Sequence, residues 1–226
     1  MKRRRFMTGF SKDTSGRSLL GWCEALIVLF SGLTVAHLGI SLFLLASFGS
    51  DPFTVMVQGI ALTAGVTVGT IHVIISTLLM IIMFFTTKGY VMPGTVICAF
   101  CGGPIINFFS WLLAPVLSGS SPLPLRLLGV VLGCVILALG MSIVINSEAG
   151  TGPNDLIAMI LTDKLKRFQF RWVRMACDLC FLITGFLLGG VVGVGTLVAV
   201  FLVGPCAQLW LPVTKKWIPA YALKNK

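Results

Sequence analysis

Long apolar runs separated by short polar segments make up most of this sequence. Their lengths predict eight helical segments, at about 24–46, 52–65, 70–87, 93–113, 126–146, 153–166, 172–188 and 195–211. Most of them reach or approach the ~18 residues that read as a membrane-spanning helix. Segments 52–65 and 153–166 are too short, because about 14 residues rise only ~21 Å against a hydrocarbon core of ~30 Å. The pattern therefore predicts an all-α, polytopic membrane protein with about six fully spanning helices and two short broken or re-entrant ones.

The sequence also resembles itself at an offset of 101 residues. Residues 38–111 and 139–212 align without a gap, and 15 of the 74 aligned positions are identical. About six identities are expected by chance for so apolar a composition. The identical pairs include Gly39/Gly140, Gly49/Gly150, Pro52/Pro153, Gly89/Gly190, Gly94/Gly195, Thr95/Thr196, Gly103/Gly204 and Pro104/Pro205. Because Gly and Pro mark special backbone conformations, the chain path repeats, and the sequence predicts two related halves.

This repeat divides the chain into a first membrane repeat over residues 22–113 and a second over residues 126–212. A linker over residues 114–125, rich in Pro, Ser and Gly, joins them, and basic tails over residues 1–21 and 213–226 flank them. If the two short helices are re-entrant, each half has three spans and the repeats are inverted. If they cross the membrane, the chain has eight spanning helices in parallel repeats. The shortness and charge of the second short helix favour the re-entrant arrangement.

Composition and charge exclude an ordinary soluble domain. Apolar residues make up 57% of the chain and charged residues 11%, and the mean hydropathy is +1.00. The net charge of +10 does not indicate nucleic-acid binding, because the basic residues form blocks beside apolar runs, at 2–17, 164–174 and 215–226. This positive-inside pattern predicts cytoplasmic N- and C-termini, with the lipid bilayer and anionic headgroups as partners. Lys88 and Arg126 lie outside the blocks. The re-entrant topology places Arg126 on the outer side of the membrane, and the eight-span topology places Lys88 there. These two residues therefore do not decide between the topologies.

Seven cysteines invite a metal or disulfide interpretation, which their pattern does not support. The pairs Cys98/Cys101 and Cys177/Cys180 lie within apolar helices, lack counterparts at the repeat-related positions and have no His cluster beside them. We expect them to be small apolar filler. The sequence also shows no nucleophile and base at useful spacing and no phosphate-binding loop. We therefore expect no enzyme activity, no cofactor and no metal.

Two breaks interrupt the apolar runs at matching places in the two halves. The first contains Gly49 and Pro52, and the second contains Gly150, Gly152 and Pro153. Because Pro suits the first position of a helix, each break should present free N–H groups at the start of a short helix. Non-helical backbone at membrane depth must be buried in protein or line water, and matching breaks in two repeats indicate a transporter site. The alternative is a pair of tight turns outside the membrane.

Polar side chains gather more at the second break than at the first. Glu148, Asn154 and Asp155 lie in or beside the second break, and Asp51 lies in the first. A helix cap is the expected role for Asn154 and Asp51. A carboxylate beside a binding cavity could instead bind a cation or carry a proton, and the sequence leaves both roles open.

Five further side chains are candidates along a pathway through the membrane. Arg174 and Asp178 form an i,i+4 pair at the start of a span, where they serve either a pathway or a structural ion pair. His37 lies in the middle of a span, where it is expected to be neutral and hydrogen-bonded across helices, with a proton relay as the alternative. Asn107 and Gln208 share one repeat position, so they are expected to line a polar path together or to bond carbonyls freed at the kinks.

Three segments of the second half resemble one bacterial family. They are residues 150–155 (Gly-Thr-Gly-Pro-Asn-Asp), residues 168–178, and the Gly193-Val-Gly-Thr196 motif with the later Gly204-Pro205. On these motifs the chain resembles the YczE branch of the YczE/YyaS/YitT integral membrane proteins, over nearly all of its length beyond the N-terminal tail. The resemblance implies a multi-pass protein of the bacterial cytoplasmic membrane, and it implies no particular activity.

Two functions from different classes fit these patterns. The first is a small-solute transporter or channel, with a small solute or ion as its ligand and a site near the two breaks. The second is a non-transporting accessory or sensor protein that acts through a partner membrane protein or a second copy of the chain. Saturable uptake into liposomes favours the first, and inert liposomes with a stoichiometric co-purifying subunit favour the second.

Overall fold

The computed structural model describes residues 18–86, 90–165, 167–168 and 170–218. Within these ranges the chain is helical, with loops between the helices and no strand. Lys88 and the basic residues of 2–17 and 219–226 lie outside the described residues. The helices are α1 (Leu19–Ala46), α2 (Pro52–Ala64), α3 (Val68–Thr86), α4 (Pro93–Leu113), α5 (Leu123–Ser147), α6 (Pro153–Leu165), α7 (Phe170–Leu187), α8 (Val194–Val198), the π-helical turn η1 (Ala199–Val203) and α9 (Gly204–Trp217).

Five helical paths in the described residues are long and apolar enough to cross a membrane, namely α1, α3, α4, α5 and the joined path from α8 to α9. α2 is apolar but has only 13 residues. The remaining span expected from the sequence is α7, which has 18 residues and carries Arg171, Arg174 and Asp178. The prediction of an all-α, polytopic membrane protein is confirmed.

The last span changes its helical form part-way along. α8 passes into η1, and η1 passes into α9, whose second residue is Pro205. Proline has no N–H for the preceding turn, and a π-turn accommodates such a local break in the hydrogen-bond ladder. The equivalent Pro104 lies inside α4, which is α-helical over its 21 residues. The two halves therefore differ at this point.

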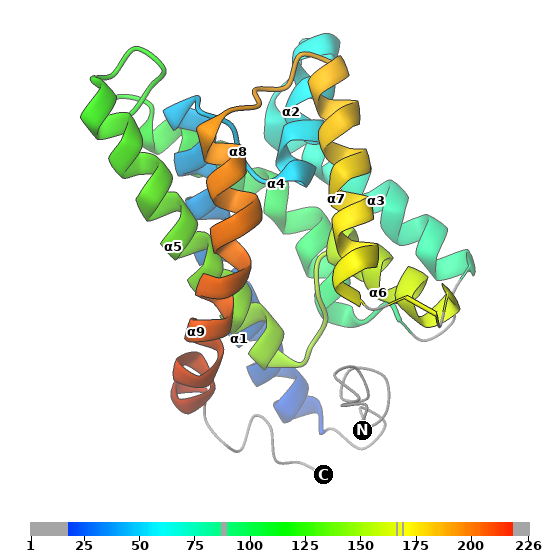
Figure 1. Ribbon diagram of the computed structural model, residues 1–226. Helices are drawn as coiled ribbons and strands as arrows, with labels where there is room; N and C mark the ends of the chain where they lie inside the picture. The colour runs from blue at the N-terminus through cyan, green and yellow to red at the C-terminus, as the bar shows by residue number, and fades with distance from the viewer. Residues whose placement is uncertain (1–17, 87–89, 166, 169, 219–226) are drawn as a thin grey trace.

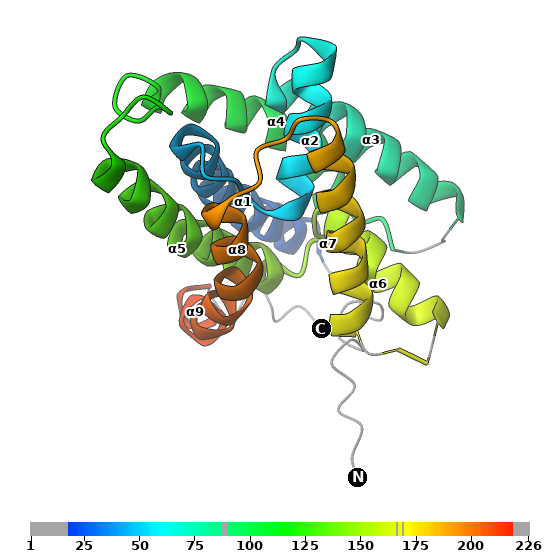
Figure 2. The same ribbon diagram turned by 45° about the horizontal axis from the view of Figure 1, so that its top comes forward.

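The long helices alternate in direction, and the two short ones turn back part-way (Figure 1). α1 rises from the lower end of that view, the chain dips to the middle, and α2 returns to the upper end. α5 descends, the chain rises to the middle, and α6 returns to the lower end. Figure 2 shows both returns from a second direction. α2 and α6 therefore begin in the middle of the molecule and run to opposite ends, and the chain paths of the two halves run in opposite directions.

The two ends of the molecule are distinguished by what lies there. Leu19 and Trp217, the first residue of α1 and the last of α9, lie at the lower end in Figure 1, which we call the tail end. The loop that joins α4 to α5 lies at the upper end, which we call the linker end. α2 returns to the linker end and α6 to the tail end.

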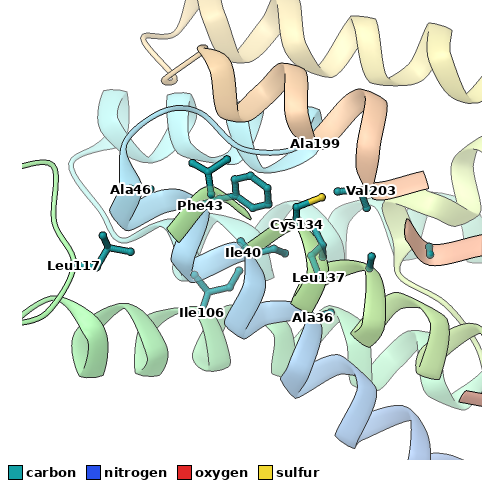
Figure 3. Packing of buried hydrophobic residues seen from close by; sticks show 13 residues of the cluster. Ala36, Ile40, Phe43, Ala46, Ile106, Leu117, Cys134, Leu137, Ala199 and Val203 are labelled. Carbon is teal, nitrogen blue, oxygen red and sulfur yellow. The ribbon is translucent and has the colours of Figure 1, made fainter. Parts of the chain in front are cut away.

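α1 and α5 cross at the centre of the molecule. An added Cβ on Gly39 would stand 2.5 Å from the backbone nitrogen of Leu137, and one on Gly140 would stand 2.5 Å from Cα of Ala36. Small residues permit this approach, which drives helix association in a bilayer through close packing. The buried cluster around the crossing, shown in Figure 3, is made of Ala36, Ile40, Phe43, Ala46, Ile106, Leu117, Val130, Cys134, Leu137, Ala138, Ala199, Val203 and Ala207.

A cation of the second half closes the end of α1. Arg126 donates from Nε to the carbonyl of Ala46 at 2.8 Å and from Nη2 to the carbonyl of Ser47 at 3.3 Å. Its guanidinium carbon lies 4.1 Å from the ring centre of Phe48. Carbonyls at a helix C-terminus lack intrahelical donors and carry partial negative charge. Arg126 therefore has a structural role as a donor to the end of α1, which explains why it lies at the linker end and not in one of the basic blocks.

Candidate functional site

The two breaks follow corresponding backbone paths. Ser47 and Glu148, 101 residues apart, end α1 and α5 in the left-handed conformation with φ of 54° and 50°. Gly49 and Gly150 follow with φ of 92° and 144°. Glycine reaches such positive angles without the steric cost that a Cβ imposes. The glycines shared by the two halves therefore mark the turns that lead into α2 and α6.

Each break is held by a helix of the other half. The amide of Gly195, at the start of α8, donates to the carbonyl of Phe48 at 2.8 Å. The amide of Gly94, at the start of α4, donates to the carbonyl of Ala149 at 3.0 Å. The two donors are 101 residues apart, and so are the two acceptors. These reciprocal bonds satisfy non-helical backbone inside the protein, which is the condition for such backbone at membrane depth.

Both short helices begin with proline, Pro52 in α2 and Pro153 in α6. Asp51 caps α2, because its Oδ2 accepts from the amide of Thr54 at 3.2 Å. Its Oδ1 accepts from the hydroxyl of Ser50, also at 3.2 Å. A carboxylate in this position is stabilised by the positive end of the helix dipole. The capping role expected for Asp51 is present in the structure.

Arg174 of α7 binds two carboxylates at once. Its Nη1 lies 2.8 Å from Oδ1 of Asp155, near the start of α6, and its Nε lies 3.3 Å from Oδ2 of Asp178, one turn further along α7. The sequence predicts only the contact with Asp178, and the contact with Asp155 is the shorter. Arg174 also interacts electrostatically with Asp51. We call Arg174, Asp51, Asp155 and Asp178 the Arg174 cluster; it includes one carboxylate from each break.

The Arg174 cluster contains more acidic than basic groups. Arg174 forms ion pairs with Asp155 and Asp178 and interacts with Asp51 only electrostatically, so two negative charges stay uncompensated when all three carboxylates are ionised. The ion-paired side chains are only 23–30% exposed, and charges act more strongly there than in bulk water. The free N–H groups at the starts of α2 and α6 offset part of the excess. The arrangement favours a proton or another cation as a ligand.

Other residues of the second break differ in their relation to the cluster. Asn154 donates from Nδ2 to Oδ1 of Asp155 at 3.2 Å, and the hydroxyl of Thr151 donates to Oδ2 at 3.5 Å. Asn154 is the second residue of α6 and orients the carboxylate of Asp155, so the capping role expected for Asn154 is not found. Gly152 directly precedes α6, as the capping residue Asp51 directly precedes α2, and glycine has no side chain that could cap a helix. Glu148 is exposed at the C-cap of α5.

The two histidines of the chain lie together in the core. His37 of α1 and His72 of α3 have ring centroids 5.3 Å apart at 80°, and they are only 6% and 7% exposed. His72 lies near the start of α3 and is nevertheless buried, because α2 covers it, with the ring centroid of Phe53 at 5.6 Å. The Nδ1 of His37 donates to the carbonyl of Leu33 at 2.8 Å, within α1 rather than across helices as expected.

Asn107 and Gln208 share a repeat position but have different surroundings. Asn107 accepts from the amide of Gly69 at 3.1 Å and donates to the hydroxyl of Thr67 at 3.0 Å. Gln208 is exposed on α9. The two amides therefore do not line a polar path together, and Asn107 bonds an amide and a hydroxyl near the start of α3 instead of a carbonyl freed at the kink. An open cavity of about 530 Å³ lies beside Asn107, lined also by Gln58, Thr67, Ser110 and Trp111.

Several buried polar atoms have no hydrogen-bond partner among the described residues. They are Nε2 of His37, Nδ1 of His72, Oγ of Ser76 and Oγ1 of Thr54, Thr77 and Thr95. Such groups are rare in folded proteins and indicate a place for water or a ligand. Of these residues the sequence indicates only His37 as a candidate, although Thr95 is one of the identical positions in the repeat.

Comparisons with known proteins give one family and no solved structure. Residues 23–212 match a family of unknown function (DUF6198). The chain is 28% identical to the uncharacterized protein YyaS of Bacillus subtilis, over 82% of this chain and 91% of YyaS. It is 27% identical to the uncharacterized membrane protein YczE of the same organism, over 81% and 83%, and 25% identical to an uncharacterized protein of Haemophilus influenzae, over 84% of each. No solved structure matches significantly. The resemblance inferred from the motifs is confirmed.

Proposed function

The chain belongs to this family of unknown function, and from its structure we propose that it is a small-solute transporter or channel. One observation carries the proposal: two helices that re-enter from opposite ends begin at the same charged cluster, where Arg174 binds Asp155 of α6 and interacts with Asp51 of α2. Discontinuous helices at matching places of inverted repeats build the substrate and ion sites of many transporters. The Arg174 cluster is the corresponding site in this proposal.

The arrangement of the two halves supports a pathway that opens to either end. The reciprocal bonds from Gly195 to Phe48 and from Gly94 to Ala149 tie each break to the other half. A movement of one half against the other therefore changes both breaks together. We propose that the halves arose as inverted repeats of one unit and that the site between them is reached alternately from the two ends.

We further propose that the protein lies in the bacterial cytoplasmic membrane with the tail end inside the cell. The described cations Lys164, Lys215 and Lys216 lie near the tail ends of their helices, and Arg126 lies at the linker end. This distribution follows the positive-inside rule. The anionic headgroups of the inner leaflet are then the lipid partners of the basic blocks.

The orientation can be tested by cysteine labelling on a background without native cysteines. Ser120→Cys lies in the linker and Lys216→Cys lies in the last turn of α9, and both positions are exposed. We expect a membrane-impermeant maleimide to label Ser120→Cys in intact cells and Lys216→Cys only after lysis. Labelling of Lys216→Cys in intact cells contradicts the proposed orientation.

Transport can be tested with purified protein in liposomes. We would measure stopped-flow light scattering for a panel of small solutes, together with proton entry under a potassium diffusion potential. At least one solute or the proton is expected to cross faster than in empty liposomes. Asp155→Asn should lower that rate roughly tenfold or more, because a neutral amide loses a charge-assisted contact with Arg174. The control Glu24→Gln removes a carboxylate of α1 outside the cluster and should leave the rate unchanged. Liposomes that are inert to every probe contradict the proposal.

The accessory or sensor function is the second candidate, and one observation favours it. The face of the last span carries exposed apolar side chains and the exposed amide of Gln208, and an added Cβ on Gly204 would meet nothing within 4 Å. Small and amide residues on an open face suit contact with another membrane helix. A subunit that co-purifies in stoichiometric amount with inert wild-type protein supports this second function.

A further inference from the structure

An open cavity at the linker end takes no part in the site proposed above. Its volume is about 530 Å³, which lies within the range of pockets that hold small molecules. α1, α2, α3 and α4 all contribute to its lining. Because α2 and α4 both end at the linker end in Figure 1, Thr67, which follows α2, and Trp111, in the last turn of α4, place the cavity there. Gln58 of the lining lies about 10 Å along α2 from Asp51, so the cavity is separate from the Arg174 cluster.

Two side-chain amides of the lining have their carbonyl oxygens engaged by backbone donors. The amide of Val191 donates to Oε1 of Gln58 at 2.9 Å. The amide of Gly69 donates to Oδ1 of Asn107 at 3.1 Å. Only the oxygen of a side-chain amide accepts such bonds, so the orientation of both groups is settled. Gln58 keeps two N–H hydrogens, and Asn107 keeps one after its bond to Thr67. What the two amides have left to offer a ligand is therefore mainly N–H donors.

Two more polar side chains line the cavity, and the structure shows no hydrogen-bond partner for them among the described residues. The indole N–H of Trp111 is a donor only, and the hydroxyl of Ser110 donates or accepts. None of the described residues that line the cavity is charged. An ion there would find no opposite charge to offset the loss of its water. The lining therefore suits an uncharged ligand with acceptor oxygens.

The repeat shows that the fold does not require this polar lining. Three of its members have apolar counterparts 101 residues later, namely Gln58/Met159, Thr67/Phe168 and Ser110/Leu211. The chain path that the two halves share therefore forms without polar residues at these positions. The lining also includes the apolar side chains of Leu44 and Leu45 on α1. Donors beside apolar carbon atoms are typical of small-molecule sites, in which a few polar groups set the orientation of the ligand.

We propose that this cavity binds an uncharged molecule that carries carbonyl or hydroxyl oxygens beside apolar carbon atoms. The oxygens accept from Gln58, Asn107 and Trp111, and the carbon atoms pack against Leu44 and Leu45. Two sources share this chemistry, a small uncharged solute and the ester group of a membrane lipid. The inference goes beyond the proposed function, because binding in this cavity requires no transport.

The test uses Trp111 as a reporter of the cavity. The chain has five tryptophans, so protein labelled with 5-fluorotryptophan gives five ¹⁹F NMR signals, and Trp111→Phe identifies the signal of Trp111. The protein is placed in nanodiscs of ether-linked lipid, which has no ester carbonyl. Acetamide, N-methylacetamide, propane-1,2-diol and glucose are titrated as uncharged probes, with sodium acetate and methylammonium chloride as charged controls. In a separate series, ester-linked lipid replaces the ether-linked lipid stepwise.

The two sources give different results. For a solute, at least one uncharged probe should shift the Trp111 signal saturably, and neither salt should do so. For a lipid, the ester-linked lipid alone should produce the saturable shift. No saturable shift in either series, or a saturable shift with one of the salts, overturns the proposal. The spectra report binding without transport, so inert liposomes with a saturable shift count against the proposed function and leave this site intact.

Two variants show whether the shift comes from the cavity. Gln58→Glu keeps an oxygen for the amide of Val191 and replaces the NH₂ donor by an acceptor, so at pH 8 it should weaken binding roughly tenfold or more. Gln208→Glu is the matched control, since it makes the same change at an exposed position of α9 and should leave the midpoint unchanged. Ser110→Leu introduces the residue that the second half has at this position and should abolish the shift. The four other ¹⁹F signals report whether each variant is folded. An unchanged midpoint in Gln58→Glu or in Ser110→Leu contradicts the site.

Discussion

Arg174→Gln is expected to lower the free energy of unfolding by about 3 kcal/mol, because removing one partner of a buried ion pair leaves uncompensated charge at a cost of about 3–5 kcal/mol. The guanidinium lies 2.8 Å from Asp155 and 3.3 Å from Asp178, and the three side chains are 23–30% exposed. This partial exposure places the expected value at the lower end of that range. For a chain of this size, the loss corresponds to a melting temperature roughly 6–12 °C lower.

The measurement is denaturant titration of the purified protein in mixed detergent and lipid micelles. Arg167→Gln is the matched control, since Arg167 belongs to the same basic block and is exposed, and its loss should change stability by less than about 0.5 kcal/mol. Adding Asp155→Asn and Asp178→Asn to Arg174→Gln should restore most of the stability, because the two carboxylates that Arg174 binds are then neutral and only Asp51, which caps α2, keeps its charge. A single Arg174→Gln variant as stable as the wild type contradicts the role given to the Arg174 cluster.

The features that depend on local chain chemistry could be predicted from the sequence. Pro52 and Pro153 open α2 and α6, since proline fits the first helical position wherever that helix lies. The all-α polytopic fold follows from the length and hydropathy of the apolar runs. Glycine at both position 49 and position 150 predicts a special backbone conformation there, and both residues have positive φ. What they contact could not be predicted, because their neighbours lie in the other half of the chain.

Contacts between distant helices account for the residues that sequence reasoning misplaced. The sequence predicts Asp178 as a partner of Arg174 because the two residues are four apart on one helix. The contact between Asp155 and Arg174 depends on the packing of α6 against α7, which the sequence does not show. His72 is close to the start of α3, and it is buried because α2 folds back over it. The length of segment 52–65 predicts a short helix but not which residues of α3 it covers, so the burial of His72 could not be read from its position.

Equal repeat positions also do not guarantee equal surroundings. A Cβ on Gly103 would contact the carbonyl oxygen of Gly69 on α3, whereas one on Gly204 would meet nothing within 4 Å. α3 therefore covers α4, and no described helix covers the equivalent face of α9. Asn107 is bonded within the fold for this reason, and Gln208, its counterpart, is exposed. Sequence symmetry predicts the chain path and leaves the packing of each copy undetermined.

Gly49→Ala is expected to destabilise the protein by about 3 kcal/mol, through backbone strain and overpacking together. Gly49 has φ of 92°, and a Cβ there would contact Oγ1 of Thr196 and stand 2.8 Å from the amide nitrogen of Gly193. Gly150→Ala should have a similar effect, since its φ is 144° and its Cβ would stand 2.6 Å from the amide nitrogen of Thr95. In both variants the new methyl group overlaps residues of the other half that pack against the break.

Alanine variants of two further glycines separate backbone strain from overpacking when all four variants are measured by the same denaturant titration. Gly65 has φ of 68° with nothing within 4 Å of an added Cβ, so Gly65→Ala carries backbone strain alone, about 1–2 kcal/mol. Gly204 is helical and equally open, so Gly204→Ala should be neutral or stabilising by about 0.5–1 kcal/mol. Equal losses in Gly49→Ala and Gly65→Ala would show that the break is not packed against the other half. A larger loss in Gly49→Ala assigns the difference to the contact between the halves, which the proposed transport pathway requires.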